Sequence, residues 1–134
     1  MTNQFFEQLK HVQELNLPPS QYLIWGSGPL TIRGIRESQD IDLLVSKSLW
    51  TQFSEKYPPS TQHLIRIGNI EMWNDCLNLT PLIDEMLAHP DIIDGLPFMR
   101  LTDTIEWKRF MNRDKDIKDI ALIQHFLKMN QQLA

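Results

Sequence analysis

The chain has 134 residues, of which 42% are hydrophobic and 22% charged, and its formal net charge is −4. This length supports one ordinary hydrophobic core, so we expect a single domain over residues 1–134. The negative charge argues against a broad DNA-binding surface, because neutralising phosphates requires clustered Lys and Arg. The single cysteine excludes an intramolecular disulfide.

The apolar runs are short. The run around Ile41–Val45 is far below the roughly 18 residues that a membrane-spanning helix needs. The N-terminal residues Met1–Glu7 have neither a basic start nor a long apolar stretch, so they do not resemble a secretory signal. We therefore expect a cytoplasmic protein that makes no membrane contact.

The first half of the chain predicts alternating helices and strands. Apolar residues at intervals of three and four predict a helix over residues 3–16. The apolar run 22–25 predicts a buried strand, and a short helix is expected to open at Pro29 because proline suits the first turn. Residues 40–45 are β-rich and favour a second strand, which a helix over 47–57 follows.

The second half predicts a hairpin and then helices. Two apolar segments, 63–67 and 70–73, flank a Gly-Asn pair that is typical of a tight turn. We expect a short helix over 82–89 and a short edge strand within 92–101. A capping pattern and an apolar stripe predict one or two helices over about 102–132. Together these elements predict an α+β domain in which helices flank a mixed sheet and the C-terminus is helical.

Two carboxylates alternate on the second predicted strand. Alternate residues of a strand point to the same face, so Asp40 and Asp42 should project together. Like charges in a partly buried setting repel unless a cation, a proton or basic groups offset them. Mg²⁺ suits this role because it prefers carboxylate oxygens and keeps waters or phosphates in its shell. The simpler alternative is a strand whose acids are only solvated.

Gly26 and Ser27 form a second candidate feature upstream. Gly26 allows a sharp backbone turn, and Ser27 offers a hydroxyl and an amide at a helix start, which can hold phosphate. The twelve residues between Ser27 and Asp40 are enough for a helix and a return loop. The turn and the carboxylates are therefore expected to meet. A plain helix cap is an alternative role for Ser27, and it is compatible with phosphate contact.

In this order and spacing, Trp25-Gly26-Ser27 and Asp40-Ile41-Asp42-Leu43 resemble the nucleotidyltransferases related to DNA polymerase beta. Residues 33–36 and 44–45 resemble those of small bacterial members. The family carries a third carboxylate on a later strand between apolar neighbours, and Glu71 matches that description.

The C-terminal segments 106–109 and 112–120 resemble the final helices of small nucleotidyltransferase-like proteins. The resemblance therefore touches both ends of the chain, and it implies a nucleotidyltransferase-like fold with its core over about residues 20–75.

The resemblance also implies a mechanism. Asp40, Asp42 and Glu71 would bind two Mg²⁺ ions that orient a nucleoside triphosphate, and Glu71 would activate an acceptor hydroxyl. Gly26 and Ser27 would contact the nucleotide. The acceptor, whether a small molecule, a protein or an RNA end, is not chosen by the sequence. The alternative for Glu71 is an exposed acid on a strand with no catalytic role, and the two interpretations are equally favoured.

Three basic residues are further candidates for nucleotide binding. Arg33 and Arg36 are placed to steer phosphates, although an ion pair with nearby Glu37 is an equal alternative. Lys108 is expected to approach nucleotide from the C-terminal helices. For that region we favour a simpler interpretation. Acidic residues of the helix form ordinary ion pairs with Lys115 and Lys118 at helical spacing. The acids concerned are Asp114, Asp116 and Asp119.

Two other functions compete with catalysis. The first is a binding or regulatory protein that keeps the fold, such as the antitoxin half of a toxin–antitoxin pair, which implies a protein partner. The second is an acidic domain without a nucleotide site. The four tryptophans include candidates for a base-stacking platform, but buried packing is the simpler assignment.

Overall fold

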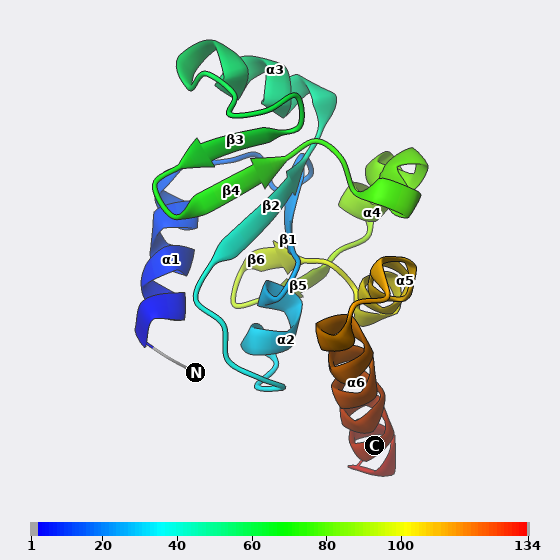
Figure 1. The fold of residues 1–134 in the computed structure, drawn as a ribbon. Coiled ribbons are helices and arrows are strands. Elements are labelled where there is room, and N and C mark those ends of the chain that lie inside the picture. The colour runs from blue at the N-terminus through cyan, green and yellow to red at the C-terminus, as the bar shows by residue number, and fades with distance from the viewer. Residues whose placement is uncertain (1–2, 134) are drawn as a thin grey trace.

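The computed structural model describes residues 3–133 and has an α+β fold built on a six-stranded mixed sheet (Figure 1). The strand order is β3-β4-β2-β1-β6-β5. The elements in chain order are α1 (Asn3–Glu14), β1 (Tyr22–Trp25), α2 (Gly28–Ile32), β2 (Ile41–Val45), α3 (Lys47–Lys56), β3 (Leu64–Ile67), β4 (Ile70–Trp73), the 3₁₀-helix η1 (Leu77–Leu82), α4 (Ile83–Ala88), β5 (Asp91–Ile93), β6 (Leu96–Phe98), α5 (Leu101–Met111) and α6 (Asp114–Leu133).

The central strands follow the sequence pattern closely. β1 and β4 have the predicted bounds, and β3 and β4 form the predicted antiparallel hairpin. β1 pairs with β2 in antiparallel fashion, whereas β2 pairs with β4 in parallel. β2 begins at Ile41, so Asp40 lies just before the strand rather than within it.

The edge strand expected within residues 92–101 is confirmed in part. β5 forms that edge of the sheet, although it begins at Asp91, and the segment also contains β6, which lies between β1 and β5. The two strands form a second hairpin. Its turn is Asp94-Gly95, and both residues have positive φ values of 52° and 78°. An Asp-Gly pair is a strong signal for a type I′ hairpin turn, and it identifies the hairpin in retrospect.

The C-terminal region contains two helices, as the sequence allowed. α5 begins at Leu101, one residue before the capping pattern that was expected to open it. It ends at Asn112, whose φ of 51° is left-handed, and α6 follows from Asp114. Asparagine tolerates this conformation better than most residues, which explains the break between the helices.

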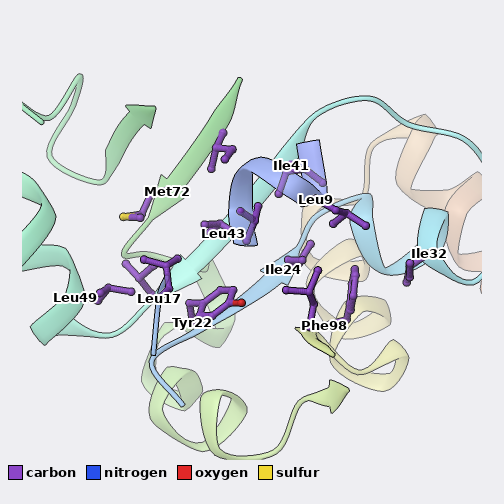
Figure 2. Packing of buried hydrophobic residues seen from close by; sticks show 14 of the residues in the cluster. Leu9, Leu17, Tyr22, Ile24, Ile32, Ile41, Leu43, Leu49, Met72 and Phe98 are labelled. Carbon is purple, nitrogen blue, oxygen red and sulfur yellow. The ribbon is translucent and has the colours of Figure 1, made fainter. Parts of the chain in front are cut away.

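The sheet has one core on each face. On one face, α1 and α3 pack against a large cluster that includes Ile24, Leu43 and Met72 (Figure 2). On the other face, Leu23, Leu44 and Trp25 pack beneath η1, α4 and α5. Figure 1 shows α1 and the C-terminal helices on opposite sides of the sheet.

A third cluster joins the C-terminal helices to the short helix α2. Leu30 of α2 packs with Leu101, Ile105 and Ile123 of α5 and α6, and all four are buried. This contact fixes the C-terminal helices next to the loop that leaves β1. Within residues 3–133, no helix has the length and apolar character needed to cross a membrane.

Candidate functional site

A row of side chains crosses four strands of the sheet. In the strand register, Trp25 of β1 lies opposite Asp42 of β2, Asp42 lies beside Glu71 of β4, and Glu71 lies opposite Arg66 of β3. Directly paired residues share a face of the sheet. Glu71 forms an ion pair with Arg66, with 3.3 Å between the carboxylate and Nε. The pairing of β2 with β4 thus brings together two of the three predicted carboxylates.

The Gly26 turn fits tightly against Asp42. Gly26 has a φ of +70°, and a Cβ atom at this position would lie 2.6 Å from Oδ2 of Asp42. A side chain would therefore be strained by the backbone and would displace the carboxylate. Gly28 is also confined, because its Cβ would lie 2.5 Å from the Ile24 side chain. The Gly26 contact places the turn after β1 against Asp42, near the start of β2.

Ser27 occupies the N-cap position of α2, but its side chain does not cap the helix. Its hydroxyl oxygen instead accepts a hydrogen bond of 2.8 Å from Nη2 of Arg36. The plain-cap interpretation of this hydroxyl is therefore wrong.

A cavity of about 340 Å³ opens over this row of residues. The acidic side chains on its wall are Asp42, Glu71 and Asp75. The basic side chains are Arg36, Lys108, Arg113 and Lys115, with Asp119 among them. The apolar side chains are Trp25, Trp73, Leu77, Trp107 and Met111. Gly26 and Ser27 complete the lining, so one cavity presents an acidic, a basic and an aromatic region.

Asp42 is held where its charge is disfavoured. The pKa of its carboxyl group is raised to about 6, chiefly by burial and also by the neighbouring charges of Glu71 and Asp40. The indole Nε1–H of Trp73 donates to Oδ1 at 3.2 Å, and this bond partly offsets the rise in pKa. Such a carboxylate favours a cation nearby.

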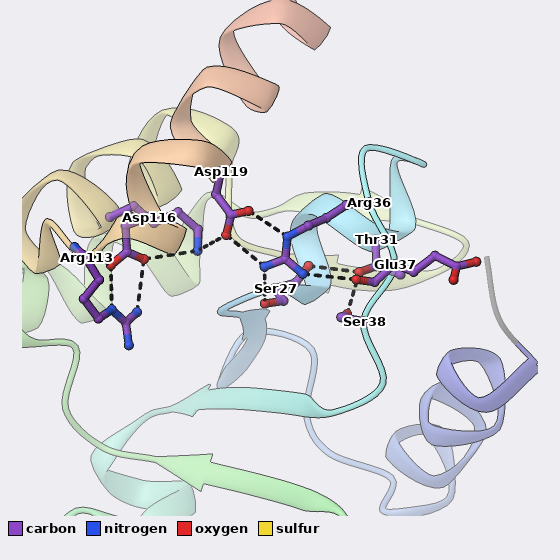
Figure 3. A network of polar contacts seen from close by, with 9 residues as sticks. Ser27, Thr31, Arg36, Glu37, Ser38, Arg113, Asp116 and Asp119 are labelled. Carbon is purple, nitrogen blue, oxygen red and sulfur yellow. Dashed lines mark hydrogen bonds and ion pairs between the residues drawn. The ribbon is translucent and has the colours of Figure 1, made fainter.

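Figure 3 shows a network of ion pairs that connects the basic wall to Ser27. Arg36 donates from Nε and Nη2 to both oxygens of Asp119, at 2.7 and 2.8 Å. Lys108 donates to the same carboxylate at 2.9 Å, and its side chain is only 3% exposed. Burial opposes the charge of Asp119, but the bonds from Arg36 and Lys108 outweigh it and lower the pKa.

Asp116 forms the other half of this network. It accepts two hydrogen bonds from the Arg113 guanidinium, and its carboxylate lies 3.7 Å from Nζ of Lys108. The expectation that Asp116 and Asp119 pair with neighbouring lysines of their own helix is therefore wrong. Their partners come from α5, from the α2–β2 loop and from the residue before α6, since both acids face inward.

The cavity brings together six of the eight predicted site residues, namely Gly26, Ser27, Arg36, Asp42, Glu71 and Lys108. Asp40 is exposed and does not line the cavity. Arg33 turns away and pairs at 2.6 Å with Asp91. The main ion-pair partner of the Arg36 guanidinium is Asp119 and not the expected Glu37.

The acidic wall offers two neighbouring carboxylates to a Mg²⁺ ion. Within residues 3–133, no three His, Cys, Asp or Glu side chains are grouped so that they hold a metal ion. Asp42 and Glu71 are nevertheless neighbours in register, and the lack of a side chain at Gly26 avoids an overlap with Oδ2 of Asp42. Two carboxylates are a sufficient protein contribution for Mg²⁺ when phosphates and water fill its shell. These two residues therefore fit one ion, and the three-carboxylate centre stays a prediction.

The sequence interpretation missed part of the cavity. Asp119 and Asp116 were assigned to a solvated face, and Asp75 was not considered. The spacing of the two aspartates, three residues apart on a helix, was a usable signal because it places both on one side. Their burial depends on contact with Lys108 and Arg36, which no local pattern reveals.

Comparisons of the chain with protein-family models, with curated proteins and with solved structures found no match. The residues that line the cavity are therefore the basis for assigning a function.

Proposed function

We propose that this protein binds a nucleoside triphosphate with Mg²⁺ in the cavity and transfers its nucleotidyl group to an acceptor hydroxyl. The proposal includes membership in the nucleotidyltransferases related to DNA polymerase beta. One observation carries it: Asp42 and Glu71 line the same cavity of about 340 Å³ as Arg36 and Lys108. That volume lies within the range of ligand pockets, and the opposed charges suit a metal–polyphosphate complex.

Each wall would take a distinct part of the substrate. Asp42 and Glu71 would hold Mg²⁺, which supplies charge neutralisation for the phosphates and orients them. Arg36 and Lys108 would attract the phosphate oxygens. Ser27 lies beside Arg36, since its hydroxyl accepts from Arg36 and keeps its own proton for donation to phosphate.

The transfer step follows from this placement. The acceptor hydroxyl oxygen forms a bond to the α-phosphorus, and the bond between that phosphorus and the bridging oxygen breaks. Pyrophosphate leaves with the electron pair. In this proposal Glu71 accepts the hydroxyl proton, and Arg36 and Lys108 stabilise the charge that develops on the phosphates.

A binding or regulatory role, such as that of an antitoxin, is the second candidate. Two observations favour it. Arg36 and Lys108 already pair with Asp119, so part of their charge is balanced within the protein. Asp40, expected as a metal ligand, is exposed and outside the cavity lining. Such a protein would bind nucleotide, or its partner, with little or no turnover.

Label transfer tests the catalytic proposal. Each of the four ribonucleoside triphosphates, labelled at the α-phosphate, is incubated with the protein, Mg²⁺ and separate small-molecule, RNA and protein fractions of a cell extract. We expect the label to appear in one fraction, with release of unlabelled pyrophosphate. Asp42→Asn should reduce the rate at least a hundredfold, because it removes a charge from the metal-binding wall (about 3 kcal/mol).

Glu55→Gln is the matched control, since Glu55 is an exposed residue of α3 on the opposite side of the sheet. This variant should transfer label as fast as the wild type. Nucleotide binding without transfer to any fraction would move the assignment to the regulatory role. Transfer that persists unchanged in Asp42→Asn would refute the proposed site.

A further inference from the structure

The aromatic region of the cavity has no role in the chemistry described above. Trp25, Trp73 and Trp107 come from β1, β4 and α5 and form one contiguous group. The Trp25 and Trp107 rings are 4.9 Å apart and tilted, whereas Trp25 and Trp73 meet edge to face at 6.3 Å. Leu77 and Met111 extend this apolar wall. The region adjoins the acidic wall, because the Trp73 indole donates to Asp42.

Two indole N–H groups in this region lack a hydrogen-bond partner. The Nε1 atoms of Trp25 and Trp107 are buried and unpaired among residues 3–133, although the two side chains are only 6% and 9% exposed. Buried tryptophan N–H groups usually find an acceptor. The Trp73 N–H, by contrast, donates to Asp42. The aromatic region therefore contains two N–H donors without hydrogen-bond acceptors, and an indole ring cannot supply an acceptor because it only donates.

We propose that this aromatic region is the subsite for the nucleobase of the bound nucleotide. The base lies against the tryptophan wall, and acceptor atoms on its edge receive hydrogen bonds from Trp25 and Trp107. This assignment rests on the proposed function, which requires the phosphates at the acidic and basic walls of the same cavity. Because both nitrogens are covered in the free protein, binding must turn the indoles toward the ligand.

The chemistry of the wall favours a base over other flat groups. An aromatic hydrocarbon would leave both N–H groups unsatisfied, whereas every nucleobase combines a π-face with ring or carbonyl acceptors. An organic cation is disfavoured, because Lys108 and Arg113 already lie 5.0 and 5.9 Å from the centre of the Trp107 ring. The bond from Trp73 to Asp42 links the subsite directly to the wall that would hold Mg²⁺.

Indole N–H resonances of the ¹⁵N-labelled protein provide the test. The chain has four tryptophans, so four signals are expected, and single Trp→Phe variants assign them. The protein with Mg²⁺ is titrated separately with ATP, GTP, CTP, UTP and inorganic tripolyphosphate. At least one nucleotide should shift the Trp25 and Trp107 signals, because their N–H groups gain acceptors. Tripolyphosphate should leave both signals in place, and Trp50 on α3 should not respond to any ligand.

Affinity gives an independent readout. Trp25→Phe and Trp107→Phe keep an aromatic ring but remove the N–H donor. Each should weaken binding of the preferred nucleotide about tenfold and leave the affinity for tripolyphosphate unchanged. Trp50→Phe is the matched control and should bind both ligands as the wild type does, since Trp50 lies outside this cavity. If a variant does not fold, the titration of the wild-type protein still decides the question.

The outcomes separate this subsite from the proposed function. A nucleotide that binds no more tightly than tripolyphosphate, with the Trp25 and Trp107 signals unmoved, overturns the base subsite and leaves phosphate and metal binding intact. A wild-type protein that binds none of the four nucleotides contradicts both the proposed function and the subsite that rests on it. Selective movement of the two signals by a nucleotide supports the subsite.

Discussion

At the scale of single residues, Asp42 and Gly26 lie in close contact, and the conformation of each lowers the stability of the folded chain. The Asp42 carboxyl group is buried beside Glu71, which raises its pKa, and Gly26 adopts a φ that other residues rarely accept. Both features keep a charged oxygen accessible at the cavity wall. Sites that bind ligands often carry such local instability.

The raised pKa of Asp42 predicts how stability depends on pH. The carboxyl pKa is about 6 in the folded chain, against 3.8 as its ordinary value. The folded state therefore binds more protons between these values, and the free energy of unfolding falls as pH rises through this range. Asp42→Asn removes the effect, while its amide oxygen can still accept from Trp73. We expect the free energy of unfolding of the variant to exceed that of the wild type by about 1–3 kcal/mol above neutral pH. The difference should shrink to about 0.5 kcal/mol at pH 4 and vanish below about pH 3.

Urea unfolding of both proteins between pH 4 and pH 8 measures this difference. A constant difference across the range would show that Asp42 keeps an ordinary pKa. Stabilisation by Asp42→Asn together with loss of ligand binding would identify Asp42 as a residue kept for function.

Gly26 offers a second residue-scale prediction. Gly26→Ala must accept both a positive φ and an overlap with Oδ2 of Asp42, so it should lower the free energy of unfolding by about 2–4 kcal/mol. Gly34→Ala is the matched control, because its φ is +74° and a Cβ there meets nothing within 4 Å. The free energy of unfolding of Gly34→Ala should fall by only about 1 kcal/mol. Equal losses in thermal or urea unfolding would mean that the contact with Asp42 is unimportant.

At the scale of elements, the C-terminal helices hold the basic wall in place. Asp119 of α6 binds Lys108 of α5 and Arg36 of the α2–β2 loop at once, and Arg36 in turn reaches Ser27. The network therefore couples α6 to the turn after β1. Ion pairs that exclude water constrain geometry more than they add to stability, since each charge gives up its hydration.

Removing Asp119 should be costly for this reason. Asp119→Asn leaves the buried Lys108 with Asp116, at 3.7 Å, as its remaining ion-pair partner among residues 3–133. We therefore expect the free energy of unfolding to fall by about 3 kcal/mol. The exposed pair of Arg109 and Glu106 supplies the control. Glu106→Gln should change stability by less than about 0.5 kcal/mol. A loss in Asp119→Asn as small as this would show that the network is solvated in solution.

The sequence predicted elements that carry their own local signals. The strands around Trp25 and Met72 and the C-terminal helical stripe were all placed correctly because periodicity marks them. Residues 92–101 were expected to hold one short edge strand because Gly95 and Pro97 interrupt the segment, and the hairpin signal of Asp94-Gly95 was not used. The inward orientation of Asp119 had no local signal, since it depends on partners 83 and 11 residues away.

At the scale of the whole molecule, the cavity forms where three distant parts of the chain meet. The turn after β1, the strands β2 and β4, and the α5–α6 pair each contribute side chains to its lining. The sequence motifs identified Asp42, Glu71 and the glycine turn. They did not reveal that Asp40 falls outside the lining or that tryptophans form one wall, because both follow from how the helices cover the sheet.

Calorimetric titration of the protein with nucleoside triphosphates, with and without Mg²⁺, tests the central claim most directly. We predict saturable binding of at least one nucleotide that requires Mg²⁺, is weakened at least tenfold (about 1.4 kcal/mol) by Asp42→Asn, and is unchanged by Glu55→Gln. Absence of binding by all four ribonucleoside triphosphates, or equal binding to the wild type and to Asp42→Asn, would contradict the claim that this cavity is a metal–nucleotide site.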